Sequence, residues 1–260
     1  MNKRFDSNDL FEFLITEAEA HFSGWDFSYI DERQSQTPLR WSYVSECLLR
    51  VRKANVILDM DTGGGEVFSR FAPFPPQTYV TESYLPNVKI AREKLEPLGV
   101  KVVALEDEEP RELPFDERFF DLILNRHGYY RAEEVQRIIQ PGGTFVTQQV
   151  GNRNDIGIRQ LLSAPNPEPI EAWDDLAKAT ADLESAGFKL IKAMEDIYLQ
   201  RFYDVGAIVY QLKAVPWQIP DFSVERYFEQ LKDAHQQITR QGYVDVAEHR
   251  FFIIAELPDV

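Results

Sequence analysis

Short apolar segments alternate with amphipathic segments through the middle of the chain. The apolar segments are bounded by glycine, proline or acidic residues, as strands are, and lie at about 55–60, 77–82, 100–106, 119–125 and 143–149. Helical periodicity occupies about 65–72, 86–97, 130–139 and 170–186. This alternation predicts an α/β fold of the Rossmann-like, doubly wound type, with a mostly parallel sheet and helices on both faces.

The two ends of the chain depart from this alternation. Residues 1–54 have a mostly helical, aromatic-rich pattern, which predicts a helical cover segment ahead of a domain that spans 55–260. Near the other end, the pattern predicts strands at about 188–198 and 251–255 and helices at about 204–214 and 223–241. The predicted sheet therefore has seven strands, and residues 200–243 form a predicted helical lid before the last one.

Composition narrows the class of protein. The 260 residues are 44% hydrophobic and 27% charged, as in ordinary globular proteins. No apolar run approaches the ~20 residues of a membrane span, and the N-terminal residues do not form a signal peptide. The single cysteine, Cys47, excludes an internal disulfide, and the histidines lack the spacing of metal ligands. We therefore expect a cytoplasmic protein with no membrane partner and no metal.

The net charge of the chain bears on its partners. A formal charge of −15 repels phosphate backbones, so nucleic acid is an unlikely ligand on composition alone. The cluster of Arg50, Arg52 and Lys53 is better explained as a solvated helix end than as a nucleic-acid patch. A small-molecule substrate is the expected partner, and the sequence leaves the oligomeric state open.

A glycine turn follows the first predicted strand. The apolar run 56–58 ends in Asp59, and Gly63, Gly64 and Gly65 come shortly after it. Glycine serves where backbone must approach a ligand or where φ is positive. The turn lies at the carboxyl end of a strand, where open α/β sheets bind small molecules. It matches neither G-x-G-x-x-G nor G-K-[ST], so the sequence indicates neither a dinucleotide fingerprint nor a P-loop.

Two acids flank this turn. Asp59 would repel a pyrophosphate but can accept hydrogen bonds from an ammonium group or from the turn. Glu82 ends the second predicted strand, where its two carboxylate oxygens can accept hydrogen bonds from both hydroxyls of a ribose. The sequence therefore predicts a nucleoside that carries a cationic arm without phosphate.

Several segments in correct order resemble the class I S-adenosylmethionine (SAM)-dependent methyltransferases. They are the turn at 59–65, Val80-Thr81-Glu82, Leu113-Pro114-Phe115 with the strand 120–124, and the Pro-Gly-Gly loop at 139–145. The resemblance covers about residues 55–150, and the strand after a helical insert resembles the small-molecule, methyltransferase type 11-like branch. One departure is Asp61, which stands where the family usually has its first glycine. Aspartate tolerates positive φ better than most residues.

The resemblance implies SAM as the cofactor. The residues that it implies at the cofactor are Asp59, Asp61, Thr62, Gly63, Gly64, Gly65, Glu82, Ser83, Asp107, Glu108 and Asn125. For the adenine, the acidic run 106–109 offers several candidates, of which Asp107 and Glu108 are favoured.

The acceptor side is predicted from the ends of the fourth and fifth strands. Asn125 and His127 are the candidate catalytic residues, with His127 as general base because imidazole suits proton transfer near neutral pH. Arg126, His127, Gln148 and Gln149 are the candidate substrate-binding residues. A purely structural His127, capping a helix or packing against Tyr129 and Tyr130, remains an equal alternative.

The predicted function is methyl transfer from SAM to a small molecule. One alternative is a methyltransferase of rRNA or tRNA bases, which would be expected to carry a basic face or an added nucleic-acid module. Another is a protein that binds SAM without transferring a methyl group, in which the acceptor pocket would be blocked.

Overall fold

The computed structural model describes residues 6–22, 27–107, 109, 112–165 and 175–259. The chain divides into two compact units. The smaller unit comprises Met1–Leu39, Asn152–Ala172 and Ile197–His249, and the larger comprises Arg40–Gly151, Trp173–Asp196 and Arg250–Val260. Among the described residues, no helix has both the length and the apolar character needed to cross a bilayer.

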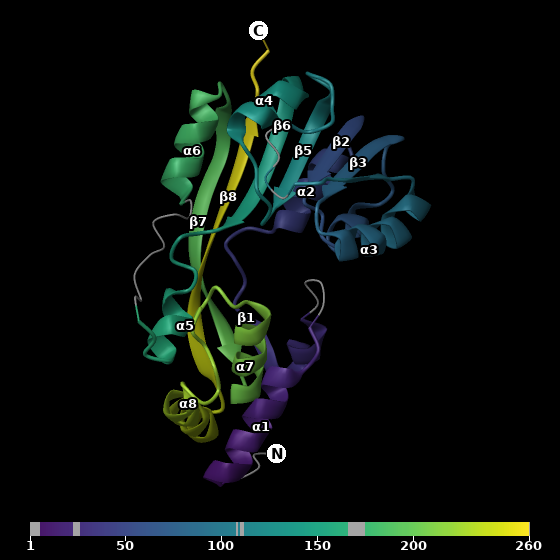
Figure 1. The fold of residues 1–260 in the computed structure, drawn as a ribbon. Coiled ribbons are helices and arrows are strands. Elements are labelled where there is room, and N and C mark those ends of the chain that lie inside the picture. Colours follow the sequence, from purple (N-terminus) through teal and green to yellow (C-terminus); the bar gives the residue numbers. More distant parts are fainter. Residues whose placement is uncertain (1–5, 23–26, 108, 110–111, 166–174, 260) are drawn as a thin grey trace. The chain divides into compact units, whose positions relative to one another are not determined.

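The larger unit contains most of the sheet and its flanking helices (Figure 1). In chain order its elements are α2 (Tyr43–Val51), β2 (Val56–Met60), the 3-10 turn η2 (Phe68–Phe71), β3 (Gln77–Glu82), α3 (Leu85–Leu95), η3 (Glu96–Leu98), β4 (Lys101–Ala104), β5 (Phe120–Arg126), α4 (Ala132–Ile138), β6 (Ile139–Val150), α6 (Leu176–Ser185) and parts of β7 (Lys189–Phe202) and β8 (Val244–Glu256).

The order of strands in the sheet is β1-β7-β8-β6-β5-β2-β3-β4. β2 pairs in parallel with both β3 and β5, β3 with β4, and β5 with β6, whereas β8 pairs antiparallel with β6. After β2 the chain adds β3 and β4 on one side and then returns to add β5 on the other. The carboxyl ends of β2 and β5 therefore flank the point where the winding reverses, and open α/β sheets bind ligands there.

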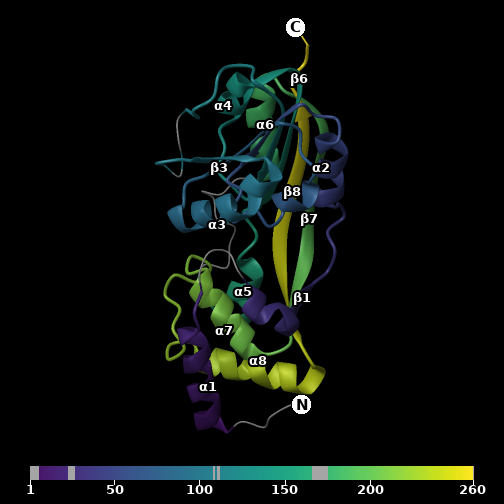
Figure 2. The ribbon, with the colours of Figure 1, turned by 90° about the vertical axis from the view of Figure 1, so that its right-hand side faces the viewer.

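Helices of the larger unit cover both faces of its sheet. On one face, the core contains Val135 and Ile138 of α4 and Leu183 of α6, packed with Leu58 and Ile123 of the sheet. α2 lies on the opposite side of the sheet (Figure 2). The mixed, mostly parallel sheet covered by helices confirms the predicted α/β class.

The smaller unit is mainly helical. Its elements are α1 (Ser7–Glu19), η1 (Ser28–Arg33), β1 (Gln34–Gln36), α5 (Ile156–Leu161), α7 (Val205–Ala214), α8 (Phe228–Gln241) and the remaining parts of β7 and β8. α7 is apolar nearly all round and buried, and Leu10 and Leu14 of α1 share its core. The predicted helix at 204–214 is α7, and α8 begins five residues later than the predicted 223.

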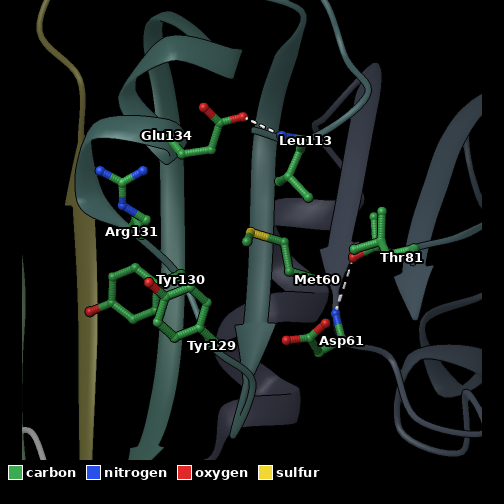
Figure 3. Close-up of a pocket in the computed structure, with 9 residues that line it drawn as sticks. Met60, Asp61, Thr81, Leu113, Tyr129, Tyr130, Arg131 and Glu134 are labelled. Atoms are coloured by element: carbon green, nitrogen blue, oxygen red, sulfur yellow. Dashed lines mark hydrogen bonds between the residues drawn. The ribbon is translucent and has the colours of Figure 1, made fainter. Parts of the chain in front are cut away.

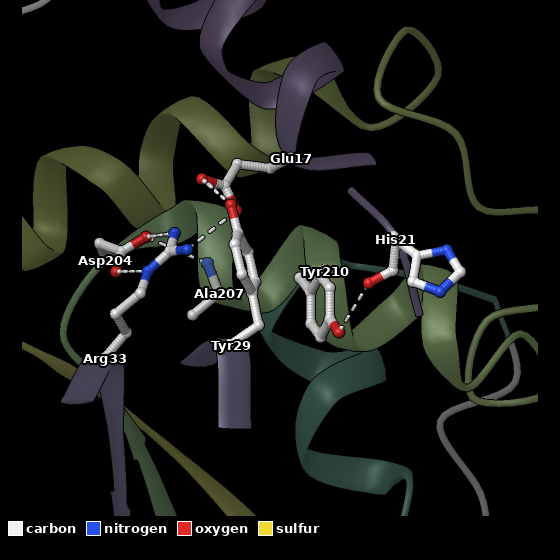
Figure 4. A network of polar contacts seen from close by, with 7 residues as sticks. All are labelled: Glu17, His21, Tyr29, Arg33, Asp204, Ala207 and Tyr210. Atoms are coloured by element: carbon white, nitrogen blue, oxygen red, sulfur yellow. Dashed lines mark hydrogen bonds and ion pairs between the residues drawn. The ribbon is translucent and has the colours of Figure 1, made fainter. Parts of the chain in front are cut away.

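A polar cluster joins α1, η1 and α7 (Figure 4). Arg33 forms a two-pronged ion pair with Asp204, at 2.8 and 2.6 Å, and its third nitrogen donates to Glu17 at 2.9 Å. Asp204 also caps α7 by accepting from the Ala207 N–H at 3.0 Å. A Cβ on Gly206 would lie 2.6 Å from the guanidinium, so glycine allows this close packing. We name this set the Arg33 cluster.

Some local predictions differ from the structure. In the part of the chain that the structure describes, the sheet has eight strands rather than the predicted seven, because Gln34–Gln36, in the segment predicted to be helical, pairs with the end of β7. The predicted helix at 65–72 is only the 3-10 turn Phe68–Phe71, because three glycines precede it and Pro73 follows it. Residues 170–174 of another predicted helix lie outside the described residues, and α6 begins after its cap, Asp175. The cover segment 1–54 and the lid 200–243 remain predictions.

Candidate functional site

The glycine turn after β2 has an unusual backbone. Asp61, Gly63 and Gly65 have positive φ values of 53°, 63° and 78°. The turn is tied to β3 because the Asp61 N–H donates to the Thr81 hydroxyl at 3.2 Å and the Thr62 N–H donates to the Thr81 carbonyl at 3.0 Å. Asp61 thus adopts a left-handed conformation, at the cost of strain for a residue with a Cβ.

The three glycines have different roles. A Cβ on Gly65 would lie 2.7 Å from Leu95, so this glycine allows α3 to pack against the turn. A Cβ on Gly64 would lie 2.4 Å from the Glu66 carboxylate. Gly63 has nothing within 4 Å of that position, so its bare backbone faces open space. Of the three, Gly63 is the one against which a ligand can lie.

Glu82 closes the turn from the neighbouring strand. One of its oxygens accepts from the Gly63 N–H at 2.8 Å, and the other accepts from the Tyr84 N–H at 2.8 Å. The side chain is buried, and burial raises its pKa while the two N–H bonds oppose that rise. Each carboxylate oxygen has a second lone pair, so Glu82 can accept further bonds from a ligand.

Asp59 lies buried at the end of β2. Burial raises the pKa of its carboxyl to about 7, the neighbouring Thr62 hydroxyl opposes the rise, and the charges of Asp61 and Glu82 add to it. Three carboxyl groups thus surround the glycine turn. Such a cluster disfavours a phosphate and favours a cation.

Asn125 is the penultimate residue of β5 and lies beside this turn, because Met60 and Asn125 are paired in the sheet. Its carbonyl oxygen accepts from the Thr147 hydroxyl at 3.0 Å and from the Gln149 amide. Its Nδ2 is fully buried and has no hydrogen-bond partner in the part of the chain that the structure describes. The two donors fix the orientation of the amide, so Nδ2 is a true donor left without an acceptor.

Gly128 brings the loop after β5 against the glycine turn. A Cβ on Gly128 would lie 2.6 Å from Asp61 Oδ2 and 2.9 Å from Asn125 Nδ2. The carbonyl of Gly128 accepts from the Gln149 amide at 3.0 Å. Asp61 and Asn125 are therefore close neighbours across a loop that only glycine permits.

His127 precedes this glycine and has a positive φ of 62°. Its N–H donates to the Gln148 carbonyl at 2.8 Å, and its Nε2 lies 3.1 Å from Gln148 Nε2. His127 is exposed by its accessible surface, but the protein packed around its ring disfavours the charged form, and Arg126 and Arg250 repel an added positive charge. Both effects hold its pKa well below the ordinary value. His127 is therefore neutral at pH 7.

Gln148 links His127 to an aromatic group. Its Oε1 accepts from the Trp41 indole N–H at 2.8 Å, and both side chains are buried. Trp41 stacks on Phe252 with ring centres 5.7 Å apart. Gln149 points its amide to Asn125, Thr147 and Gly128 instead, so the two neighbouring glutamines serve different parts of the site.

A pocket lies beside Asp61 of the turn (Figure 3). Asp61, Met60 and Thr81 line it from β2 and β3, and Tyr129 and Tyr130 line it from the loop after β5. The remaining lining residues are Leu105, Leu113, Arg131 and Glu134. The pocket lies near the carboxyl ends of β2 and β3, because Met60 ends β2 and Thr81 is next to the last residue of β3.

The predicted adenine residues are less informative. Asp107 is exposed and accepts from the Glu109 N–H at 3.0 Å in a local turn, and Glu108 lies outside the described residues. Ser83 is half-buried beside Glu82, and Arg126 is exposed at the end of β5. The charge of Arg126 reaches Asp59 at the turn and opposes the rise in the pKa of that carboxyl.

The structure adds residues that the sequence did not assign to the site. Gly128 and Tyr129 lie in a predicted loop, Tyr130 at the start of a predicted helix and Thr81 near a predicted strand end, so their places could have drawn attention to them. Trp41 was placed in a cover segment, and no sequence signal connects it to Gln148, which is 107 positions away.

Comparisons with known proteins identify the fold. No model of a known protein family and no curated sequence matches the chain. A candidate methyltransferase from Bacillus halodurans C-125 matches with a TM-score of 0.56 and 18% identity, over 84% of this chain and 100% of that one. A functionally unknown protein from Deinococcus radiodurans R1 matches with 0.57 and 14%, over 86% and 90%. A structure of the Haloferax volcanii Trm112 methyltransferase activator in complex with a candidate methyltransferase matches with 0.51 and 16%, over 90% and 93%. The chain has the general class I methyltransferase fold.

Proposed function

We propose that this protein is a SAM-dependent methyltransferase. The observation that carries the proposal is the 2.8 Å hydrogen bond from the Gly63 N–H to the Glu82 carboxylate. It brings a bare backbone turn and an acid from the next strand to one point at the carboxyl edge of the sheet. A ribose bound there would lie against Gly63 with its hydroxyls at Glu82. The fold similarity supports the same reading.

The remaining polar groups at the turn fit the rest of SAM. Asp59 and Asp61 provide negative charge for its ammonium group. The buried Nδ2 of Asn125, which lacks an acceptor among the described residues, provides a donor for its carboxylate. An unpaired buried donor is costly, and a bound carboxylate would remove that cost.

When bound, the cofactor supplies a methyl group already activated by a sulfonium charge. The protein's tasks are then to orient the acceptor and to exclude water. The loop after β5 and the end of β6 are the proposed acceptor side, with Arg126, His127, Gln148 and Gln149 as the proposed substrate-binding residues and Asn125 and His127 nearest the chemistry. The acceptor is proposed to be a small molecule, because the net charge of −15 disfavours nucleic acid.

Calorimetric titration with SAM and S-adenosylhomocysteine tests the cofactor. Glu82→Ala is expected to weaken binding by roughly 1.5–3 kcal/mol, the range for a hydrogen bond to a charged group. Glu82→Gln keeps one acceptor oxygen and should lose less. Glu66→Gln in the same turn is the matched control, because Glu66 is exposed and pairs with Lys94. Unchanged affinity in a folded Glu82→Ala protein would reject the site.

Labelled SAM then separates the functions. Transfer of label to a metabolite extract supports a small-molecule methyltransferase, and transfer to total RNA supports the nucleic-acid alternative. Tight SAM binding without transfer to either supports a protein that only binds SAM.

A further inference from the structure

The hydrogen bonds around Gln148 determine where the proton of His127 lies. An indole N–H can only donate, so the Gln148 atom 2.8 Å from Trp41 Nε1 must be its oxygen. The amide nitrogen of Gln148 then faces His127 Nε2 at 3.1 Å. That nitrogen can only donate, so Nε2 must accept and carries no proton.

A neutral imidazole holds one proton, and with Nε2 excluded it lies on Nδ1. Among the described residues, the structure gives Nδ1 no hydrogen-bond partner, and His127 is exposed just after the carboxyl end of β5. The positive φ of His127 and its N–H bond to the Gln148 carbonyl hold the residue in this place. Such a strained backbone at a loop beside a site is a mark of functional positioning.

We infer that Trp41, acting through Gln148, locks His127 in the tautomer that presents an Nδ1–H donor, so that His127 positions an oxygen of the methyl acceptor instead of abstracting its proton. The functional half of this inference rests on the proposed methyltransferase function. The lone pair that a general base needs is on Nε2, where the Gln148 amide already occupies it. An acceptor suited to this site carries a hydrogen-bond-accepting oxygen, such as a carboxylate or carbonyl, beside the methylated atom.

The charged groups around His127 agree with this role. Arg126 and Arg250 lie close enough for their positive charges to disfavour protonation of the ring. Protonation would also place an N–H of His127 against the N–H of Gln148. Both effects keep the imidazole ring neutral. The positive charges also attract an anionic or carbonyl oxygen of an acceptor near the ring.

Nitrogen NMR of the histidine side chains in the ligand-free protein tests the lock directly. The chain has four histidines, and the spectrum of His127→Gln identifies the signals of His127. We expect a protonated Nδ1 and an unprotonated Nε2 that persist from pH 8 to pH 5.5. A protonated Nε2, or an ordinary titration with a midpoint near 6.5, would overturn the inference.

Two substitutions are expected to change which nitrogen of His127 carries the proton. In Gln148→Glu, both carboxylate oxygens accept, so His127 should move its proton to Nε2 and titrate at a higher pH than in the original protein. Trp41→Phe keeps the stack on Phe252 but frees the Gln148 amide to rotate, so both tautomers should appear. Tyr43→Phe is the control, because it removes a polar atom beside the same Phe252 ring and leaves the three groups in place. A Trp41→Phe spectrum identical to that of the original protein would also contradict the inference.

SAM binding measured on the same samples separates two kinds of failure. If the tautomer is as stated but SAM does not bind, the lock stands and the proposed function fails. If SAM binds but His127 carries its proton on Nε2, the proposed function stands and the donor role is wrong.

Discussion

The Arg33 cluster and the polar groups around Asn125 both lie in the interior of a unit. They differ in whether every polar group has a hydrogen-bond partner. In the smaller unit, the guanidinium of Arg33 is bound by two carboxylates, and Tyr29 packs against it. In the larger unit, Asn125 Nδ2 lacks an acceptor within the described ranges. A complete cluster contributes to holding helices together, whereas an incomplete one is what a ligand can complete.

The backbone shows the same contrast. The Arg33 cluster is built on helix ends with ordinary conformations, and Asp204 simply caps α7. The site contains two of the non-glycine residues with positive φ in the described chain, Asp61 and His127. Strain of this kind persists only where the surroundings enforce it, so the larger unit gives up some stability at its site.

Breaking the complete cluster should have the largest effect on folding. Arg33→Met leaves Asp204 and Glu17 partly buried without their cation, and we expect the free energy of unfolding to fall by about 3 kcal/mol. Urea denaturation measures the loss. Arg226→Met is the control, because Arg226 is 62% exposed in its pair with Asp221 and should matter by less than about 1 kcal/mol. Equal losses in the two variants would remove the distinction between the clusters.

The next largest effect on stability is expected at the contact between the glycine turn and the loop after β5. Gly128→Ala introduces a Cβ 2.5 Å from that of Asp61, and such overpacking should cost about 1–3 kcal/mol of stability. Asp61→Gly removes the opposing atoms and relieves the positive φ, so the double variant should recover much of the loss. Thermal unfolding of the two single variants and the double variant measures the coupling. Strictly additive effects would show that the two loops do not press on each other.

The affinity of the candidate site for a cationic ligand should depend on pH. The Asp59 carboxyl has a pKa of about 7, so below that pH it holds a proton that an ammonium ligand must displace. SAM affinity should therefore rise by about fivefold, or about 1 kcal/mol, between pH 6 and pH 7, a range in which the α-amino group of the ligand stays largely protonated. Calorimetry in buffers of different ionisation enthalpy should detect proton release at pH 6. Asp59→Asn should remove both effects, and a release that survives this substitution must come from another group.

The smallest expected effect is the change of the free energy of unfolding with pH. The pKa of His127 is lower in the folded chain than in the unfolded one, so the unfolded state binds more protons below about pH 6.5. His127 therefore makes stability fall as the pH drops through 6.5. The raised pKa of Asp59 acts in the opposite direction between about pH 4 and 7. Urea unfolding at pH 7.5 and 5.5 should show a smaller acid loss in His127→Gln than in the original protein, and a larger acid loss there would contradict this account.

The sequence predicted the proximity of Gly63 and Glu82, which depends on local pattern. Gly63 and Glu82 could be paired before the structure was known, because strand ends at one edge of a parallel sheet converge and both residues sit at such ends. The α/β class followed from the same alternation. The prediction failed at 65–72, where helical periodicity was overridden by glycines before it and proline after it.

Other features depend on contacts that no local pattern records. Trp41 reaches Gln148 across 107 residues, and Arg33 reaches Asp204 across 171. The orphaned Nδ2 of Asn125 is visible only when every neighbouring donor and acceptor is located. The candidate site therefore depends on hydrogen bonds between residues that are far apart in the sequence, and the glycine motif alone does not specify them.

The burial of Trp41 against Phe252 has a practical consequence. Its indole N–H is bonded to the side chain that in turn contacts His127, so its fluorescence should respond when a ligand shifts that chain of contacts. Trp217, by contrast, is 45% exposed and belongs to the other unit. The chain has three tryptophans besides Trp41, namely Trp25, Trp173 and Trp217. Replacing all three by phenylalanine would leave Trp41 as the only tryptophan, so that its fluorescence could report occupancy of the acceptor side without a coupled assay.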